Sequence, residues 1–344
     1  MVDADEVARH RLPEDENRAI FRDEIVPDLL AGRATQEIPT VVFLIGQPGA
    51  GKSRVTDMVA DVLNKRGGFV DVDSDLYKPY HPEYDALMAQ DDTLMAAYTR
   101  ADGRAWMAQA EQYVRDNGLN AVIQETSQDG AAVAEKMAAY REAGARVEAL
   151  AMGVPEAMSN QGIVHRYHEQ VRERGQGRLT VQANADQSYS GILDLAVRVD
   201  DGRLADQTAV FRRGEAEPRY SNALSSAGEW QAPPAFRAAI EAERVRPWTQ
   251  KETADFVAAQ TKLRAGMGRE WAGRLDRIEN LAKPLMTPDG VKALADARRS
   301  AAATATSTTV KAKPAPAQKP PSASPDAAPR RDGPGQSPGP RRIR

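Results

Sequence analysis

Two stretches of the sequence carry residue types that could handle a phosphoryl group. The first, GQPGAGKS at residues 46–53, combines three glycines with a lysine and a hydroxyl group. The second, GFVDVDSDLYKPYHP at residues 68–82, has aspartates at every second position, Asp71, Asp73 and Asp75. Side chains alternate faces along a strand, so a continued strand would bring three mutually repelling carboxylates to one side. We therefore expect either a solvated edge or one aspartate that is placed for chemistry.

The first stretch fits the phosphate-binding pattern G-x-x-x-x-G-K-[ST] and lies between an apolar run and an amphipathic helical pattern. Its glycines allow a tight loop whose backbone amides converge on phosphate oxygens, and the following helix directs its positive end at the same anion. Lys52 can bridge the β and γ phosphates, while the Ser53 hydroxyl can ligate Mg²⁺. We expect this phosphate loop to bind ATP through Gly46, Gln47, Pro48, Gly49, Ala50, Gly51, Lys52 and Ser53.

Apolar strand patterns alternate with helical patterns through the first part of the chain. The run TVVFLIG at residues 40–46 is unbroken and rich in β-branched residues, as in a buried parallel strand. This alternation predicts an α/β fold, with a parallel sheet of the P-loop NTPase type flanked by helices. Further strands are expected at 69–73, 120–124, 146–152 and 208–214, and intervening helices at 52–66, 103–117 and 131–144.

Composition predicts four parts, with boundaries at 1–37 (helical lead-in), 38–215 (P-loop kinase domain), 216–299 (helical C-terminal appendage) and 300–344 (tail). The C-terminal region has apolar residues at helical spacing, so one face could cover the core domain or meet another chain. The tail is rich in proline, alanine and arginine, and holds eight basic residues against two acidic ones. Such a segment cannot bury enough apolar surface to offset its ordering entropy, so we expect it to be disordered.

With 41% hydrophobic and 28% charged residues, the composition is typical of a globular protein. No apolar run approaches the roughly 18 residues of a membrane-spanning helix, and the polar N-terminus lacks the apolar segment of a signal peptide. We therefore expect a cytoplasmic protein without membrane contact. The chain has no cysteine, and its four histidines show no zinc-ligand spacing. The basic tail could contact nucleic acid, although a solubilising role is the simpler interpretation.

Over residues 20–215 the sequence resembles the zeta toxin family, P-loop kinases of toxin–antitoxin pairs. The resemblance rests on the phosphate loop, on SDLYKPYHP at 74–82, on NAVIQET at 120–126, and on two arginines in HRYHEQVRERGQGR at 165–178. It implies transfer of the γ-phosphoryl group of ATP to the 3′-hydroxyl of the amino sugar in UDP-N-acetylglucosamine, which blocks cell-wall precursor synthesis. It also implies a small helical antitoxin as a partner.

The resemblance assigns the catalytic base to Asp75. At the exit of the second predicted strand, this carboxylate could accept the proton of the sugar hydroxyl. Asp71 and Asp73 come earlier, inside the predicted strand, and match no reacting group.

The resemblance also assigns Arg166 and Arg178 to the transferring group. Phosphoryl transfer spreads negative charge over oxygen atoms, and fixed guanidinium groups stabilise that charge together with Lys52. Arg172 and Arg174 lie in the same stretch of sequence. We expect these two on a solvated helix face.

The sequence departs from the family at the acceptor site. Where members commonly show Glu-Gly-Thr, this chain has Gln124, Glu125 and Thr126, and Gln128 replaces the arginine that often follows. We expect the first three at the substrate, with His81 as a lesser contact. Another nucleotide sugar, or another hydroxylated metabolite or antibiotic, is compatible with the remaining residues. A protein of a different functional class is also compatible with the sequence. This alternative is an ATP-binding interaction protein that works through its helical C-terminal region and basic tail.

Overall fold

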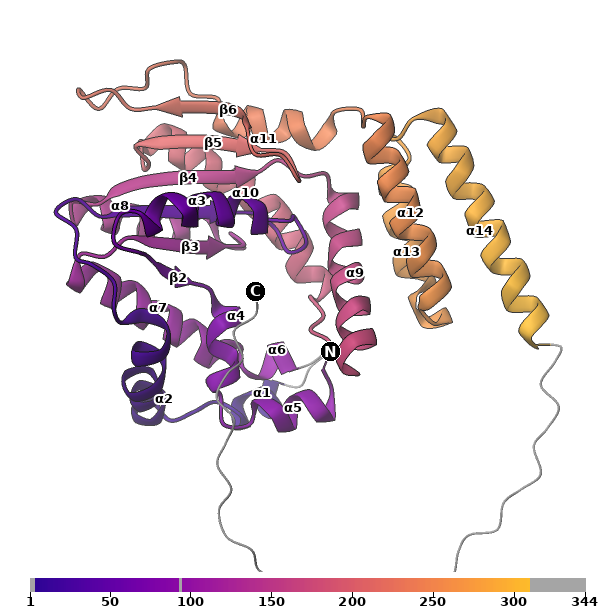
Figure 1. The fold of residues 1–344 in the computed structure, drawn as a ribbon, viewed down its shortest axis with the longest axis horizontal. Helices are drawn as coiled ribbons and strands as arrows, with labels where there is room; N and C mark the ends of the chain where they lie inside the picture. The colour runs from indigo at the N-terminus through magenta and orange to yellow at the C-terminus, as the bar shows by residue number, and fades with distance from the viewer. Residues whose placement is uncertain (1–3, 93–94, 310–344) are drawn as a thin grey trace, which may run out of the picture. The chain divides into compact units, whose positions relative to one another are not determined.

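The computed structural model of the chain describes residues 4–92 and 95–309. In these residues one six-stranded sheet has the strand order β2-β3-β1-β4-β5-β6 (Figure 1). Neighbouring strands are parallel except at one edge, where β6 pairs antiparallel with β5. This arrangement confirms the predicted α/β fold of the P-loop NTPase type. The strands are β1 (Thr40–Ile45), β2 (Val70–Val72), β3 (Ala121–Glu125), β4 (Arg146–Met152), β5 (Gln207–Phe211) and β6 (Pro218–Ala223).

The central strand β1 is buried along its whole length. Val41, Phe43 and Ile45 belong to one apolar core, and Val42 and Leu44 belong to a second core on the opposite face. Because side chains alternate along a strand, an unbroken apolar run requires cover on both faces of the sheet. The run TVVFLIG therefore determines that this sheet lies between two layers of helices.

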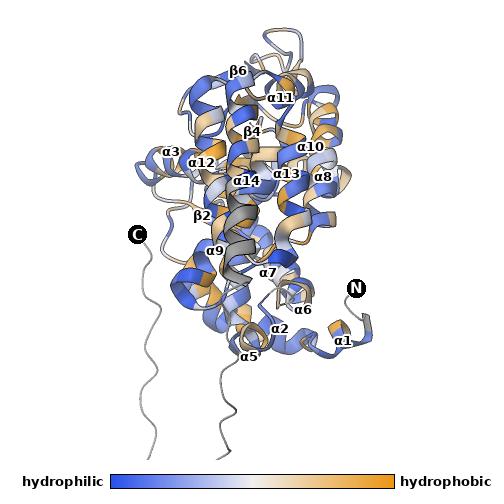
Figure 2. Ribbon diagram, turned by 90° about the vertical axis from the view of Figure 1, so that its right-hand side faces the viewer, coloured by the Kyte–Doolittle hydropathy of each residue, from blue (hydrophilic) through white to orange (hydrophobic). Residues whose placement is uncertain are grey.

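Helices supply that cover on both faces (Figure 1). Figure 2 shows hydrophilic and hydrophobic residues mixed along them, as expected for helices with one buried side. The first core contains residues of the π-helical segment η1 (Phe21–Leu30) and of α7 (Arg100–Asn117), α8 (Gly130–Glu142), α10 (Gln182–Gly202) and α11 (Phe236–Val245). The second contains residues of α3 (Ser53–Asn64), α9 (Glu156–Arg174), α12 (Gln250–Gly266) and α13 (Ala272–Ala282).

Short helices complete the N-terminal part and the segment that follows β2. Asn17 ties this part to α7, since its side-chain amide donates to Asp102 at 3.0 Å and its carbonyl accepts from the Trp106 indole at 2.9 Å. These short helices are α1 (Ala4–Arg9), α2 (Glu14–Ile20), α4 (Ser74–Tyr77), η2 (Lys78–Tyr80), α5 (Tyr84–Gln90) and α6 (Met95–Tyr98).

The edge strand β6 is absent from the sequence-based expectation. Most of its side chains are exposed or half-buried, and PRYSNA has no alternating apolar residues to indicate a strand. It forms because the exposed edge of β5 accepts a partner strand. The sheet therefore continues past residue 215, where the sequence suggested a boundary.

The C-terminal helices α12 and α13 pack against α9. Gln161 of α9 donates to the Phe256 carbonyl at 2.9 Å, and Gln260 donates to Glu279 at 3.2 Å. The amphipathic face of this region thus covers the chain's own core. Residues up to Ala302 form one compact unit, and a second unit begins at Ala303.

The remaining C-terminal elements are η3 (Arg269–Trp271) and α14 (Pro288–Thr309). The alanine-rich start of the predicted tail extends α14, while residues 310–344 lie outside the described residues. Within the described residues, no helix has the length and apolar character needed to cross a membrane.

Thr249 caps α12 through a reciprocal pair of hydrogen bonds with Glu252. The Thr249 hydroxyl accepts from the Glu252 amide at 3.2 Å, and the Glu252 carboxylate accepts from the Thr249 amide at 2.8 Å. Thr249→Ala is expected to lower the free energy of unfolding by about 1 kcal/mol, because one helix N–H loses its acceptor. Urea unfolding followed by circular dichroism measures this loss. Thr261→Ala, at an exposed position in the middle of α12, is the control, and an equal loss in both variants would contradict the capping role.

Candidate active site

The phosphate loop joins the end of β1 to the start of α3. Gly49 and Gly51 have φ angles of +77° and +81°, in the left-handed region that favours glycine. A Cβ atom at Gly49 would lie 2.1 Å from the Ser159 carbonyl oxygen of α9, and one at Gly162 would lie 2.5 Å from the Gly49 carbonyl oxygen. The backbone of the loop is therefore in direct contact with the backbone of α9.

The amides of the phosphate loop are available to an anion. In the described part of the chain, the N–H groups of Gly49, Gly51, Lys52 and Ser53 donate to no backbone or side-chain acceptor. Unpaired N–H groups at a helix start and the helix dipole both favour negative charge. The Lys52 side chain folds back over the loop, with Nζ 3.3 Å from the Gly46 carbonyl oxygen. Ser53 is the exposed first residue of α3.

The three aspartates lie in different places because β2 ends at Val72. Asp71 is in the strand, accepts from Gln124 Nε2 at 3.3 Å, and lines a small separate pocket. Asp73 caps α4, since its Oδ1 accepts from the Asp75 amide at 2.9 Å. The prediction that Asp73 lies inside the strand is wrong, because the chain turns into α4 directly after Val72.

Asp73, Asp75 and Lys52 line one cavity of about 1500 Å³. Burial lowers the pKa of the Lys52 ammonium, and the carboxylates of Asp73 and Glu125 oppose that effect. Burial also raises the pKa of Asp73, and repulsion from Asp75 adds to it. Charged groups in this cavity are thus partly removed from water. Their electrostatic interactions with a bound ligand are therefore stronger than they would be in bulk solvent.

Asp75 is held by two cations inside the cavity. The Lys78 ammonium lies 2.7 Å from Asp75 Oδ1, and an Arg178 guanidinium nitrogen lies 3.4 Å from the same oxygen. Burial alone would raise the pKa of the Asp75 carboxyl. Lys78 and Arg178, with a smaller effect from Arg166, outweigh burial and hold this pKa well below its usual value. Asp75 is therefore a carboxylate at neutral pH.

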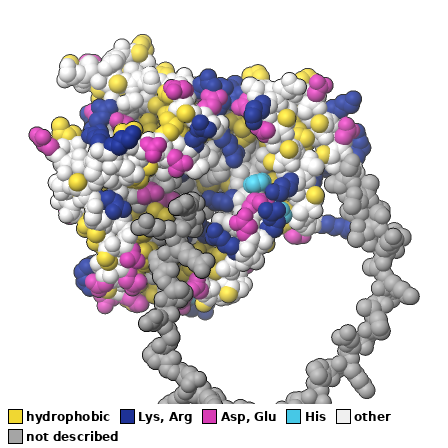
Figure 3. All heavy atoms as spheres, in the orientation of Figure 1, with side chains coloured by type: hydrophobic (Ala, Val, Ile, Leu, Met, Phe, Trp, Pro, Cys, Tyr) yellow, Lys and Arg dark blue, Asp and Glu magenta, His cyan; other side chains and the backbone are white. Residues whose placement is uncertain are grey.

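The structure brings both predicted arginines to the cavity. Arg166 of α9 contacts the Thr180 hydroxyl at 3.4 Å, and Arg178 lies on the segment between α9 and α10. Arg172 and Arg174 are exposed and do not line the cavity. Figure 3 shows basic and acidic side chains interspersed with histidine on the face of the molecule that carries α9.

Gln124, Glu125 and Thr126 all line the cavity, but strand alternation separates the first two. Gln124 faces Asp71, as described above. The Glu125 carboxylate lies 2.9 Å from the Lys136 ammonium of α8, which also pairs with Glu111 at 2.8 Å. Glu125 is thus committed to a buried ion-pair cluster, and Gln124 is the more available of the two.

His81 lies away from the cavity. Its side chain is fully buried, with Nε2 3.0 Å from the His10 carbonyl oxygen and 3.5 Å from Asp102. Its Nδ1 accepts from the Glu83 amide at 3.2 Å. These contacts fix the turn after α4 and leave no ring nitrogen for a substrate.

Five lysine and arginine residues of the cavity were missed by the sequence reasoning: Lys78, Arg100, Arg104, Lys136 and Arg213. A signal existed for two of them. Lys78 lies three residues after Asp75, the spacing of neighbours on a helix, and Arg213 lies at the carboxyl end of a predicted parallel strand, where ligands bind. The side chain of Arg213 donates to the Met158 carbonyl at 2.9 Å, which places it between α9 and the phosphate loop.

The chain is similar to known proteins in sequence and in fold. A family model described as Zeta toxin matches residues 28–225, which is more than half of the chain and includes the phosphate loop, Asp75 and both predicted arginines. The chain belongs to the zeta toxin family. Helices α11, α12, α13 and α14 lie beyond the matched range.

Two curated relatives are each named Toxin zeta. The relative from Enterococcus hirae is 23% identical over 183 residues, which cover 52% of this chain and 61% of the relative. The relative from Streptococcus agalactiae is 26% identical over 142 residues, which cover 41% of this chain and 49% of the relative. The chain thus spans about half to three fifths of the length of these relatives.

A solved structure from work on the PezAT chromosomal toxin–antitoxin system of Streptococcus pneumoniae has a similar fold. The TM-score is 0.61 at 15% sequence identity, and the match covers 78% of this chain and 98% of the other chain. At this identity, the similarity establishes the fold.

Asp71 is expected to destabilise the folded chain at alkaline pH. Burial, together with repulsion from Asp73, raises its pKa to about 6, above the value of about 3.9 of an unfolded chain. The folded chain therefore binds the additional proton, and the stability that this proton provides is lost as pH rises through 6. Asp71→Asn keeps an oxygen acceptor for Gln124 and is expected to raise the free energy of unfolding at pH 8 by about 2 kcal/mol.

Urea unfolding at pH 8 and at pH 4 measures this effect, which should be small at the lower pH. Asp61→Asn, at an exposed position of α3, is the matched control. A loss of stability at pH 8 in Asp71→Asn would show that the ionised carboxylate is favourable where it lies.

Proposed function

We propose that this chain is an ATP-dependent kinase that phosphorylates a hydroxyl of UDP-N-acetylglucosamine or a related nucleotide sugar. The observation that carries the proposal is the joint lining of one cavity by the phosphate loop, the Asp75 carboxylate and a set of cations. Phosphoryl transfer needs these groups together, since it depends on positioning and on stabilising negative charge. Membership of the zeta toxin family supports the same reaction.

The size of the cavity supports a reaction between two ligands. A volume of about 1500 Å³ exceeds the roughly 300–1000 Å³ of a typical small-molecule site. The phosphate loop and the side chains of Gln124, Thr126 and Gln128 all line this cavity. ATP would lie against the loop, and the acceptor would lie against the other three residues.

Residues of the phosphate loop would hold the triphosphate. The amides of the loop and the Lys52 ammonium would contact phosphate oxygens, with Lys52 bridging the β and γ phosphates. The Ser53 hydroxyl would be a ligand of Mg²⁺, which neutralises charge on the phosphates when bound. Arg166 and Arg178 would stabilise the charge on the transferring group, because both guanidinium groups line the cavity.

Asp75 would orient the acceptor hydroxyl and take its proton. The hydroxyl oxygen bonds to the γ-phosphorus as the bond to the ADP oxygen breaks, and the hydroxyl proton passes to the Asp75 carboxylate. Since Lys78 and Arg178 hold the pKa of Asp75 low, this carboxylate is a weak base. It would therefore receive the proton late, once the forming oxygen–phosphorus bond has made the hydroxyl acidic.

Two arginines support an anionic acceptor. Arg100 and Arg104, one turn apart on α7, line the cavity. Arg100 donates to Gln128 at 2.6 Å, and Arg104 has no hydrogen-bond or ion-pair partner among the described residues. Guanidinium groups without a carboxylate partner favour a ligand with phosphate groups over a neutral hydroxylated metabolite. A nucleotide sugar meets this requirement through its diphosphate.

In the cell, this activity would act as a zeta-type toxin that consumes a cell-wall precursor. A small antitoxin would then be the natural partner, in keeping with the toxin–antitoxin setting of the similar solved structure. The packing of α12 and α13 on α9 favours the kinase over an interaction protein, because the predicted interaction face is used within the chain.

The first test is the reaction itself. Purified protein with ATP, Mg²⁺ and a panel of nucleotide sugars is expected to give a product with one additional phosphate, detected by mass spectrometry. Asp75→Asn is expected to lower kcat by about a hundredfold or more, because the variant cannot accept the proton. Asp71→Asn, whose side chain faces the separate pocket, is the control and should retain activity.

No phosphorylated sugar, together with ATP turnover that Asp75→Asn leaves unchanged, would refute the kinase. Phosphorylation of a different acceptor with the same dependence on Asp75 would keep the kinase and correct its substrate.

The acceptor contacts can be tested separately. Arg104→Met is expected to raise the KM for the nucleotide sugar about tenfold and to leave the KM for ATP unchanged, because the lost charge-assisted contact is to the acceptor. Steady-state kinetics with each substrate varied in turn measures both constants. Arg172→Met, at an exposed position outside the cavity, is the control. An increase confined to the KM for ATP would place Arg104 at the donor instead.

A further inference from the structure

Helix α11 lies beyond residues 28–225, the range that matches the family model, yet it approaches the phosphate loop. Its Phe236 and Ile240 are buried in the first core. Glu243 lies against Gly153, which follows β4, so closely that a Cβ atom at Gly153 would be 2.6 Å from the Glu243 Cβ. Residue 153 is therefore restricted to glycine by this contact, and α11 has a fixed position at the carboxyl end of the sheet.

The next residue of α11, Arg244, has a buried side chain with only 3% of its surface exposed. One guanidinium nitrogen donates to the Tyr189 carbonyl of α10 at 2.7 Å, and the guanidinium carbon lies 3.8 Å from the centre of the Tyr189 ring. A second nitrogen approaches Gln47 Oε1 of the phosphate loop at 3.5 Å. The Nε atom has no hydrogen-bond partner.

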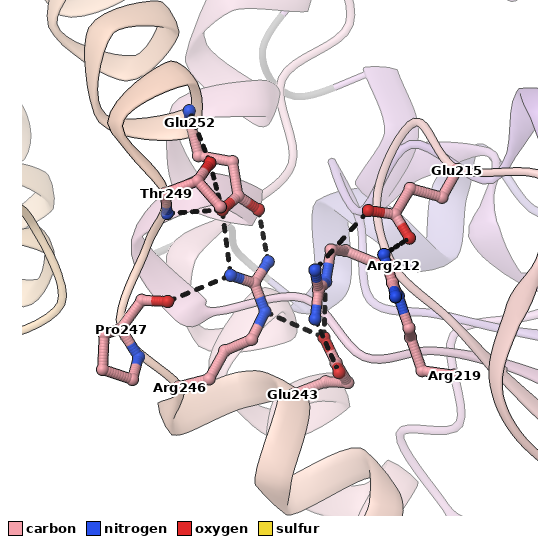
Figure 4. A network of polar contacts seen from close by, with 8 residues as sticks. All are labelled: Arg212, Glu215, Arg219, Glu243, Arg246, Pro247, Thr249 and Glu252. Atoms are coloured by element: carbon pink, nitrogen blue, oxygen red, sulfur yellow. Dashed lines mark hydrogen bonds and ion pairs between the residues drawn. The ribbon is translucent and has the colours of Figure 1, made fainter.

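No carboxylate lies within ion-pair distance of Arg244 among the described residues. The adjacent Glu243 is already engaged, because Arg212 contacts both of its oxygens at 2.8 and 2.9 Å and Arg246 adds a third contact at 2.9 Å (Figure 4). Burial lowers the pKa of Arg244 to about 10, so the guanidinium stays charged at neutral pH. Glu156 and Glu241 act on this cation only from beyond ion-pair distance. A buried cation without an ion-pair partner is costly, so we looked for a role other than stability.

The contact between Arg244 and Gln47 determines how the phosphate loop is supported. Gln47 is buried, and its Nε2 donates to the Val154 carbonyl at 2.9 Å and contacts the Ser159 hydroxyl at 3.3 Å. With Nε2 on these acceptors, Oε1 must face a donor, and Arg244 is that donor. The side chain of Gln47 is thereby fixed at both ends, and its backbone continues into the amides that face the cavity.

We propose that Arg244 is a positioning residue of the nucleotide site, which fixes Gln47 and places a positive charge behind the phosphate loop. The inference rests on the proposed binding of ATP. In that complex the phosphates supply negative charge on the front of the loop, where it attracts the guanidinium behind it. Helix α11 is then a component of the site, although it lies outside the matched family range.

The test compares the binding of ADP and of AMP, which lacks the β phosphate, by titration calorimetry with the full chain. Wild-type protein that binds no ADP would refute nucleotide binding itself, and the inference with it. If wild type binds, Arg244→Met is expected to weaken ADP binding about tenfold and AMP binding much less, because the lost support acts at the loop. Arg237→Met, which removes an exposed arginine of the same helix, is the control and should change neither.

Unchanged ADP binding in Arg244→Met, or an equal loss for ADP and AMP, would overturn the inference. Should circular dichroism show that this variant does not fold, Arg244→Lys and Gln47→Leu are combined in a double-mutant cycle of ADP binding. If Arg244 acts through Gln47, the double variant should bind ADP about as weakly as the weaker single variant. Additive losses would show that the two residues act independently and would refute the positioning role.

Discussion

The close contact between the phosphate loop and helix α9 is the constraint on which the site depends. Two glycines, Gly49 and Gly162, allow the two backbones to approach to a distance that leaves no room for a Cβ atom. Arg166 follows Gly162 by one helical turn, so this contact also sets where its guanidinium enters the cavity. The C-terminal helices α12 and α13 also pack on α9, and Gln161, next to Gly162, donates to the Phe256 carbonyl of α12.

The order of strands and helices could be predicted from the sequence because local patterns determine it. The phosphate loop follows from its pattern of glycines, lysine and serine, and the central strand and β4 follow from their runs of apolar residues. The pairing of side chains from distant elements could not be predicted in this way. The distance between Asp75 and Arg178 depends on the path of the segment after α9. Asp73 caps α4 because β2 ends one residue earlier than the predicted strand.

The C-terminal region shows why composition alone gave an incomplete description. Its charged, amphipathic sequence was compatible with a face for a partner or a cover for the core, since both bury one side of a helix. The structure distinguishes these through buried polar contacts such as Gln161 with Gln260 at 3.1 Å, which require a specific partner surface. The network around Glu243 and Arg246 in Figure 4 likewise joins α11, α12 and the end of β5.

The ion pairs of Asp75 involve two cations that a bound polyphosphate would also attract. Lys78 and Arg178 hold the pKa of this carboxyl low, and both cations also line the cavity that a polyphosphate would enter. If ATP binds as proposed, a cation that turns from Asp75 toward a phosphate would remove part of that effect, and the carboxylate would become more basic. By reciprocity, protonation of Asp75 frees the same cations for the phosphates. The proposed site would therefore couple its affinity for ATP to the proton affinity of Asp75, and a change in one would report on the other.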